Sequence, residues 1–375
     1  MDLNNMLYWN DLMLNDILEA VEDLQIGRDV LQPTDPFLLS DRKFVQVFRL
    51  SKGMVQELVE MVSPFMLPQS RGSALSITTR VLAALRFYAS GSHQEITGTN
   101  HYISISQAST SRAIVEVTNA LNRPEILNHK VKFPRTQHER EALRTRFFDL
   151  YGFPGILGII DCTHVAIVAP KDPNHPEHIY VNRKNYHSLN VQLVCDHDLK
   201  ILNVNSRFPG SSHDAFIWAQ SPISTYMENC YRRNPANVFF LLGDSGYPTR
   251  PWLLTPLPNP VNPGEQLFND RLCSIRSLIE RCNGVLKNRF RCLLRYRTMH
   301  YHPTLSGKIV NACCILHNMC IENNVPIPEE LHPVEPDYGM YAAGNVVNIR
   351  PTANPDLAAA RRLQQNIINN HFNIQ

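Results

Sequence analysis

The sequence has no long apolar run, no paired cysteine motif and almost no net charge. No stretch approaches the roughly 18 consecutive apolar residues that a membrane-spanning helix needs, and the acidic opening lacks the basic-then-apolar pattern of a secretory signal. The nine cysteines are scattered, with no C-x-x-C pair, which argues against a disulfide-rich secreted domain. We therefore expect a reduced, intracellular protein with no membrane partner.

The low net charge does not exclude nucleic acid as a partner. At 375 residues the chain has room for two domains, and its formal charge of +2 says little, because binding depends on where positive charge clusters. Cys313, Cys314, His317 and Cys320 fall at helical spacing and raise zinc as an alternative. They lie on an apolar helix, where cysteine packs as a small hydrophobic residue, so we favour packing over zinc.

Composition and periodicity divide the chain into four segments. Residues 1–40 form an acidic, helical opening that ends in prolines, and residues 41–150 read as helical throughout. Residues 151–325 mix strand-like and helical periods, which predicts an α/β fold with a mixed sheet flanked by helices. Residues 326–375 form a polar tail with a possible amphipathic helix at the end. The expected strand segments are 156–161, 164–169, 188–195, 201–208 and 238–242.

The helical segment contains a candidate helix-turn-helix at residues 93–121. A short helix around Gln94 is followed by a turn at Gly98, and Ser106 opens a second helix whose first turn is small and polar and ends in Arg112. The first turn of such a helix presents side chains and N–H groups to a DNA duplex, which makes Arg112 a candidate DNA contact. An ordinary helical hairpin with a serine cap fits the pattern equally well.

Acidic residues stand at positions where metal ligands are expected. Asp161 ends the apolar stretch 156–161, Asp244 follows the strand 238–242, and Glu280 lies in a later helix. A carboxylate at the end of a buried strand needs a partner or a cation. Three carboxylates aimed at one point could hold two Mg²⁺ or Mn²⁺ ions, the arrangement used to cleave phosphodiesters. Asp214 is a fourth candidate, with a helix N-terminal carboxylate as the alternative.

Basic residues surround these acidic positions. Glu280 is the single carboxylate among eight lysines and arginines between Arg271 and Arg297, which suits a polyanion lying across the helix, although a solvated face gives the same pattern. The loop 182–187 offers a second basic and aromatic segment, with a plain surface hairpin as the alternative. The candidate DNA contacts from these two stretches are Arg183, Lys184, Arg276, Arg281, Lys287 and Arg289.

Taken together, these segments resemble the PIF/Harbinger family of DDE transposases, and closely the Harbinger transposase-derived nucleases. The matching motifs run in family order over roughly residues 155–320. They are Ile160–His164, Asn182–Lys184, Ser188–Gln192, Gly210–Asp214, Gly243–Pro248, Glu280–Gly284, Leu286–Phe290 and Leu316–Asn318.

The resemblance implies an RNase H-like core with the acidic triad at Asp161, Asp244 and Glu280. Asp214 matches a further acidic position that the family pattern treats as metal-binding, and residues 106–121 resemble the family's helix-turn-helix. The cofactor implied is Mg²⁺ or Mn²⁺ and the substrate is DNA. A separate Myb-like protein is implied for sequence-specific DNA binding and nuclear import, which places the chain in the nucleus and also in the cytoplasm.

Two departures from the family pattern leave the acidic positions intact. Asn185 stands where the family usually has glycine after the Arg-Lys pair, and asparagine tolerates the left-handed conformation. Cys162 replaces a common glycine beside Asp161. The sequence therefore predicts a metal-dependent DNA endonuclease of the DDE type. The alternative is a domesticated DNA- or chromatin-binding protein that no longer cuts.

Overall fold

The computed structural model describes residues 35–68, 75–92, 94, 97, 102–327 and 354–372. Its contacts divide the chain into two compact units, residues 1–123 with 290–292 and residues 124–289 with 293–375. The helices α7 and α8, which were expected in the helical segment 41–150, belong to the second unit. Within the described ranges, none of the helices has the length and hydropathy required to span a bilayer.

The first unit is helical in its described part, and serines define where its helices begin. Ser40, Ser51, Ser76 and Ser106 each accept a backbone N–H of the following turn, which is the preferred N-cap arrangement. The elements are η1 (Pro36–Leu38), α2 (Asp41–Phe48), α3 (Lys52–Val62), η2 (Ser63–Phe65), α4 (Ile77–Ser90) and α6 (Gln107–Leu121). The cap at Ser106 confirms the predicted start of the second helix.

Polar contacts join α4 to α6. The Arg80 guanidinium lies 2.6 Å from the Glu116 carboxylate and also donates to the carbonyl oxygen of Leu67 at 2.8 Å. Nearby, the Tyr88 hydroxyl lies 2.6 Å from the hydroxyl of Thr118 in a buried contact. Of the first helix of the predicted helix-turn-helix, only Gln94 and Thr97 are described, both as helical, and the turn at Gly98 lies outside the described residues.

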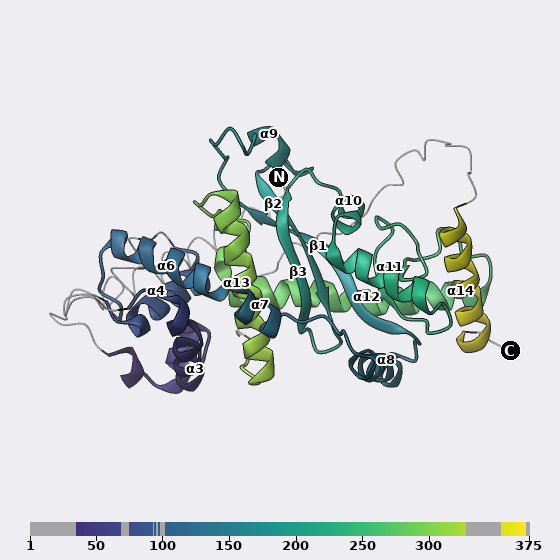
Figure 1. Cartoon of the computed structure of the whole chain (residues 1–375), viewed down its shortest axis with the longest axis horizontal. Helices are drawn as coiled ribbons and strands as arrows, with labels where there is room; N and C mark the ends of the chain where they lie inside the picture. The colour runs from purple at the N-terminus through teal and green to yellow at the C-terminus, as the bar shows by residue number, and fades with distance from the viewer. Residues whose placement is uncertain are drawn as a thin grey trace, which may run out of the picture. The chain divides into compact units, whose positions relative to one another are not determined.

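The second unit is built on a mixed five-stranded sheet with the order β3-β2-β1-β4-β5 (Figure 1). The three strands β1, β2 and β3 pair in antiparallel fashion, whereas β1 with β4 and β4 with β5 are parallel. The strands are β1 (Ile156–Ala166), β2 (Ser188–Cys195), β3 (Ile201–Pro209), β4 (Phe240–Leu242) and β5 (Leu253–Leu254). The mixed sheet predicted from the sequence is confirmed.

The predicted division of this strand is wrong. The stretch 156–161 and the first three residues of 164–169 belong to the single strand β1, which runs through Cys162 and Thr163 because β2 pairs with it from Ile159 to Ala166. The long helix α12 (Pro263–Arg289), which carries Glu280, starts at a proline. Proline is well suited to the first helical position, since its missing N–H would have no partner there.

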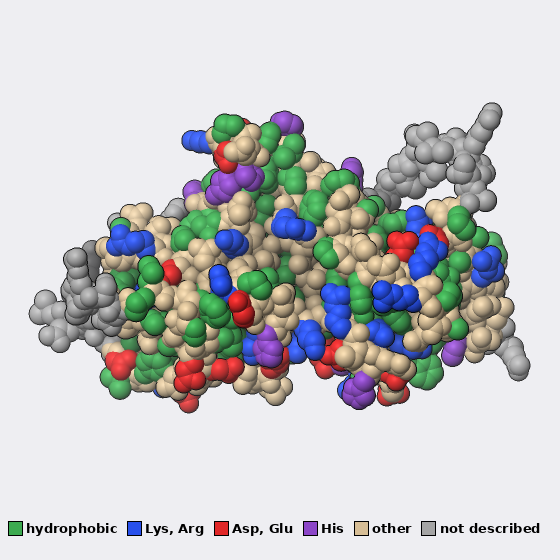
Figure 2. Space-filling model, viewed as in Figure 1, with side chains coloured by type: hydrophobic (Ala, Val, Ile, Leu, Met, Phe, Trp, Pro, Cys, Tyr) green, Lys and Arg blue, Asp and Glu red, His purple; other side chains and the backbone are tan. Residues whose placement is uncertain are grey.

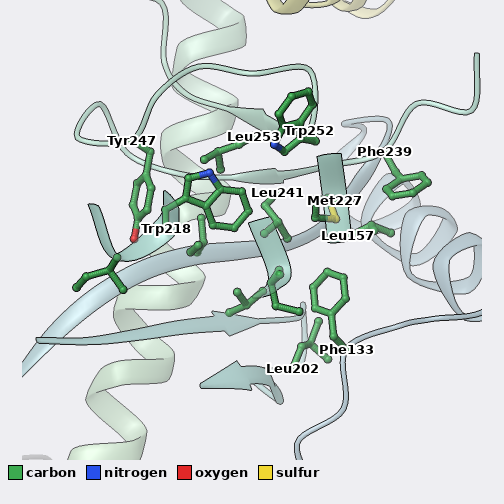
Figure 3. Packing of buried hydrophobic residues seen from close by; sticks show 14 of the residues in the cluster. Phe133, Leu157, Leu202, Trp218, Met227, Phe239, Leu241, Tyr247, Trp252 and Leu253 are labelled. Carbon is green, nitrogen blue, oxygen red and sulfur yellow. The ribbon is translucent and has the colours of Figure 1, made fainter. Parts of the chain in front are cut away.

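Helices lie on both faces of the sheet (Figure 1). A hydrophobic cluster on one face joins β1, β4 and β5 to the helices α10 and α11, with Trp218, Tyr247 and Trp252 among its aromatic members (Figure 3). On the other face α12 packs against β1 and β2, and α13 packs against β3. The helices are α7 (Pro124–Lys130), α8 (Gln137–Tyr151), α9 (Glu177–Tyr180), α10 (Asp214–Ala219), α11 (Pro222–Arg233), α12 (Pro263–Arg289), η3 (Arg291–Leu293), α13 (Pro303–Glu322) and α14 (Pro355–His371).

The last helix, α14, confirms the helix predicted near the C-terminus and packs on α12. The ring of Phe372 lies 5.4 Å from that of Phe153 and 6.0 Å from that of Phe268, measured between ring centroids. The buried amide of Gln364 donates to the carbonyl oxygen of Thr255 at 2.8 Å. This helix therefore completes the core of the second unit.

Replacing Gly210 with alanine is expected to destabilise the second unit by about 3 kcal/mol, the upper range for overpacking. A Cβ at Gly210 would meet the Ser188 hydroxyl and would lie 2.5 Å from the carbonyl oxygen of Tyr180, where backbone atoms cannot move aside. Thermal or urea unfolding checks this. The matched control is Gly284→Ala on α12, whose Cβ meets nothing within 4 Å; equal losses in the two variants would contradict the prediction.

Candidate active site

Asp161 lies in the middle of β1, not at its end as the sequence suggested. Its backbone is opposite Leu193 of β2, and one of its carboxylate oxygens accepts the backbone N–H of Cys162 at 2.8 Å. Alternate residues of a strand face opposite sides of the sheet. Ile160 and Cys162 enter the hydrophobic cluster on the α10 side, so Asp161 is turned toward α12.

Asp244 follows β4 by two residues. Because β4 is the parallel neighbour of β1, the carboxyl end of β4 brings Asp244 beside the central part of β1. The side chain is only 6% exposed, and one carboxylate oxygen accepts the backbone N–H of Gly246 at 2.9 Å. The turn after β4 thus holds the carboxylate in one orientation.

Asp214 is the first residue of α10 and contacts the side chain of Asn190 on β2. The Asn190 amide donates to the Asp214 carboxylate at 2.9 Å and to the carbonyl oxygen of Ser212 at 2.8 Å. Its negative charge acts on both Asp161 and Asp244. Asp214 also acts on the Cys162 thiol on the α10 side of the sheet, and its role as a metal ligand stays a prediction.

The three aspartates form an electrostatically unfavourable group without a cation. Burial raises the pKa of Asp161 to about 8, and the negative charges of Asp244 and Asp214 add to the increase. The pKa of Asp244 is also raised, chiefly by burial. Arg276 opposes both shifts. A group of carboxylates whose negative charge is only partly offset by Arg276 fits a hard divalent cation such as Mg²⁺ or Mn²⁺.

Arg276 supplies one positive charge to this group from α12. Its guanidinium lies 3.5 Å from the Asp161 carboxylate, and both side chains are 15% exposed. Further along the same helix, the Lys287 ammonium donates to the carbonyl oxygen of His164 at 2.8 Å. These two contacts fix the face of α12 that lies along β1.

Glu280 lies on that face of α12. It comes four residues after Arg276 and seven before Lys287, spacings that keep side chains on one side of a helix. Its side chain is exposed, unlike that of Asp244. The charges that act on Asp161 come from Arg276, Asp244 and Asp214, so the role of Glu280 as a third ligand stays a prediction from the sequence motif.

The loop before β2 presents Arg183 and Lys184 to solvent close to the aspartates. The pKa of Asp244 is raised overall, and the positive charge of Arg183 opposes part of that rise. The two groups therefore lie near one another. Asn182 shapes the loop, since its side-chain oxygen accepts the Lys184 backbone N–H at 2.9 Å. Asn185 has a φ of 59°, which confirms the expected left-handed turn.

The structure gives two predicted DNA contacts structural roles instead. Arg289 is 1% exposed and donates to the carbonyl oxygen of Val325 at 3.1 Å, so it closes the end of α13. Lys287 is 8% exposed and is bonded to β1. Both side chains lie on the buried side of α12. A count of charges along the sequence does not show which side of the helix is buried. Arg281 and Arg112 are exposed and stay candidate DNA contacts.

Sequence reasoning missed two contributors to the site. Asn190 lies within the motif at residues 188–192 but was assigned no role of its own. Its amide stands in a strand that is buried along its whole length, where a polar side chain needs a hydrogen-bond partner. Tyr247 was also overlooked; its buried hydroxyl lies 3.3 Å from the Cys162 thiol, and burial raises its pKa far above the usual range. No pattern in the sequence pointed to the latter contact.

Comparison with known proteins gives matches along most of the chain. The family model described as DDE superfamily endonuclease matches residues 160–318. The Homo sapiens protein named "Putative nuclease HARBI1" is 38% identical over 291 residues, covering 77% of this chain and 80% of that protein. Its Xenopus laevis counterpart is 35% identical over 338 residues, covering 89% and 91%.

A plant relative is more distant, and the structural comparison adds nothing. The Arabidopsis thaliana protein named "Protein ALP1-like" is 26% identical over 306 residues, covering 77% of this chain and 72% of that protein. No solved structure matches. The identity and coverage of the vertebrate relatives, together with the mixed sheet that places Asp161 on β1 and Asp244 just after the adjacent strand β4, confirm the resemblance drawn from the motifs. The chain belongs to the Harbinger transposase-derived nucleases of the DDE endonuclease superfamily.

Proposed function

We propose that this chain is a metal-dependent DNA endonuclease that cleaves phosphodiester bonds by a two-metal mechanism. The observation that carries the proposal is the placement of Asp161 and Asp244 on and just after two neighbouring strands, where burial raises the pKa of Asp161 to about 8 and the charges of Asp244 and Asp214 add to the rise. A structural protein gains nothing from such a group, whereas a cation site requires it. Glu280 on α12 completes the ligand set in this proposal.

The residues of the chain orient the site before substrate arrives. The Asn190 amide and the backbone N–H groups of Gly246 and Cys162 each occupy one carboxylate oxygen of an aspartate. The second oxygen of Asp161 faces the Arg276 guanidinium at 3.5 Å. Bound divalent cations would stabilise the charge on the scissile phosphate and activate the attacking water. Preorganisation of this kind lowers the cost of assembling the site.

Nicking of supercoiled plasmid by the purified full-length chain tests the proposal. We expect nicking with Mn²⁺ or Mg²⁺ that EDTA abolishes and added metal restores. A folded protein that binds DNA without nicking it under any of these conditions would instead support the alternative of a DNA- or chromatin-binding protein with a retired site. Oligonucleotides labelled at either end then show whether cleavage leaves a 3′-hydroxyl, the group that a transposase uses for strand transfer.

We further propose that Arg183 and Lys184 hold the DNA backbone beside the aspartates. The double variant Arg183→Ala/Lys184→Ala is expected to weaken DNA binding. The slope of log binding constant against log salt concentration should become less steep by about 2, because each phosphate contact contributes about 0.9 to that slope. Fluorescence anisotropy across a salt series measures this. Arg362→Ala, an exposed arginine on α14, is the control and should change neither quantity; an unchanged slope in the double variant would contradict the assignment.

We also propose that targeting depends on a separate Myb-like protein and that the chain acts in the nucleus, with a cytoplasmic fraction. The basis is the family resemblance, which assigns sequence-specific DNA binding and nuclear import to a separate protein. Fluorescence microscopy with and without the partner tests it. We expect nuclear enrichment only when the partner is present.

A further inference from the structure

A cluster of two histidines and one aspartate lies outside the group of aspartates. The Nδ1 atom of His175 and the Nε2 atom of His302 each lie 3.0 Å from the same carboxylate oxygen of Asp172. The two imidazole rings are 4.3 Å apart between centroids and nearly perpendicular. Histidine side chains gather beside α9 in the space-filling view (Figure 2). Among the described residues, these three side chains form a group in which one possible metal-ligand atom of each residue lies within 4.8 Å of those of the other two.

Local hydrogen bonds hold Asp172 and His175 in place. The second carboxylate oxygen of Asp172 accepts the backbone N–H of Asn174 at 3.0 Å and its amide at 3.2 Å. The backbone N–H of His175 donates to the carbonyl oxygen of Asp172 at 2.9 Å, closing a tight turn. One carboxylate oxygen is thus fully engaged in the turn, and the other faces the two imidazoles.

His302 comes from a segment far along the chain, yet main-chain contacts fix its position. It is the N-cap of α13, and Val168 just after β1 donates to the carbonyl oxygen of Met299 at 3.0 Å. The loop that carries Asp172 and the start of α13 are therefore joined by backbone pairing close to the cluster. A site whose ligands are held by separate hydrogen bonds is preorganised.

We propose that Asp172, His175 and His302 bind a divalent transition-metal cation of the Zn²⁺ type. Imidazole nitrogens favour zinc and related metals, whereas Mg²⁺ prefers oxygen ligands, so this site and the carboxylate group select different cations. Tetrahedral zinc with bonds of about 2.0 Å places its ligand atoms roughly 3.3 Å apart. The 3.0 Å separations here need only a small opening.

The cluster is accessible, which leaves a coordination position for water. The side chains of His175, Asp172 and His302 are 25%, 31% and 43% exposed. Three protein ligands with one open position are a known arrangement for zinc. The carboxylate supplies negative charge that offsets part of the charge of the cation.

Binding requires a tautomer change at His302. The Thr304 backbone N–H lies 3.3 Å from Nδ1 of His302, an arrangement in which Nδ1 accepts and the ring proton sits on Nε2, facing Asp172. Coordination through Nε2 moves that proton to Nδ1 and gives up this long hydrogen bond. The ligand atom itself is not lost, so the change lowers the affinity without removing the site.

The bound cation would connect the start of α13 to the loop that leads through α9 into the turn with Arg183 and Lys184. That loop runs from the end of β1 to the start of β2. A metal clip at its base would restrict the loop without touching Asp161, Asp214 or Asp244. The inference therefore stands whether or not the chain cleaves DNA.

Isothermal titration of the EDTA-stripped, full-length chain with Zn²⁺ tests the site, in excess Mg²⁺ and in an Asp161→Asn/Asp244→Asn background. That background removes the carboxylate site, so failure of the nuclease proposal does not affect the result. We expect one Zn²⁺ per chain and a rise in Tm on binding. Introducing His175→Ala or His302→Asn should lower the affinity by about tenfold or more. His178→Ala, an exposed neighbour outside the cluster, should leave it unchanged.

His302→Asn keeps a side chain that can cap α13, so loss of binding there is not a loss of folding. Far-UV circular dichroism of each variant confirms this. With Co²⁺ in place of Zn²⁺, visible absorption of a tetrahedral site should appear in the background protein and disappear in both histidine variants. No zinc binding by the folded background protein, or equal affinity in the histidine variants, would overturn the proposal.

Discussion

Replacing Asp244 with asparagine is expected to reduce metal-dependent DNA nicking by about a thousandfold or more. Asparagine has nearly the same shape, so the 6%-exposed side chain keeps its packing and can still accept the N–H of Gly246 at one oxygen. What it loses is the negative charge and one of the two oxygens available as ligands. Each tenfold loss in rate corresponds to about 1.4 kcal/mol, and the stabilisation lost with a catalytic cation amounts to several kcal/mol.

Initial rates of plasmid nicking at saturating Mn²⁺ measure the effect. The matched control is Asp198→Asn, because Asp198 lies in the turn between β2 and β3 with a side chain that is 66% exposed. It should nick at the rate of the unaltered protein. DNA binding without metal should be equal in all three proteins. An Asp244→Asn protein that still nicks at the original rate would mean that cleavage occurs at another site or comes from a contaminating nuclease.

The second large effect concerns the metal-free protein, whose stability should fall as pH rises from about 4 to about 8. The pKa of Asp161 is about 8 in the folded chain and 3.8 for an ordinary aspartate, so the folded state holds a proton that the unfolded state has released over this range. Stability therefore decreases with rising pH until the folded pKa is passed. The stabilising contribution is complete below about pH 4.

Asp161→Asn should remove this pH dependence, since the amide does not titrate. At pH 8 the metal-free variant is expected to unfold several degrees above the unaltered protein, because the buried negative charge is gone. Calorimetry at a series of pH values with EDTA checks both results. Added Mn²⁺ should reverse the order of the two proteins, since cation binding favours the ionised carboxylate. Parallel profiles for the two metal-free proteins would contradict the assignment.

The sequence allowed the strands and their aspartates to be located, but not the extent of β1. Apolar runs before Asp161 and Asp244 predicted buried strands, and both were confirmed. Cys162 and Thr163 fell between two predicted strands, and only the pairing with β2 shows that one strand continues through them. Register is a tertiary property that local periodicity does not contain.

Local sequence patterns also did not show which basic residues are buried. Arg276, Arg281 and Arg289 lie within 14 positions of one another on α12 yet have different surroundings. Arg276 pairs with Asp161, Arg281 is exposed, and Arg289 is enclosed against the end of α13. Their partners come from β1 and α13, segments distant in sequence. The charge cluster was correctly located, but its division into surface and interior depends on the packed fold.

The packing of α14 determines which part of the chain must be inherited together for the fold to stay stable. The family model covers residues 160–318, yet β1 begins at Ile156 and the core is closed by Phe372, more than fifty residues past that span. A gene fragment cut to the recognisable motifs would leave Phe153 and Phe268 without their aromatic neighbour. Exon shuffling or gene fusion that carries only the recognisable segment would therefore transfer Asp161 and Asp244 without the helix that completes the core. Copies that lose this terminal helix are expected to decay first as folded proteins, before their acidic residues change.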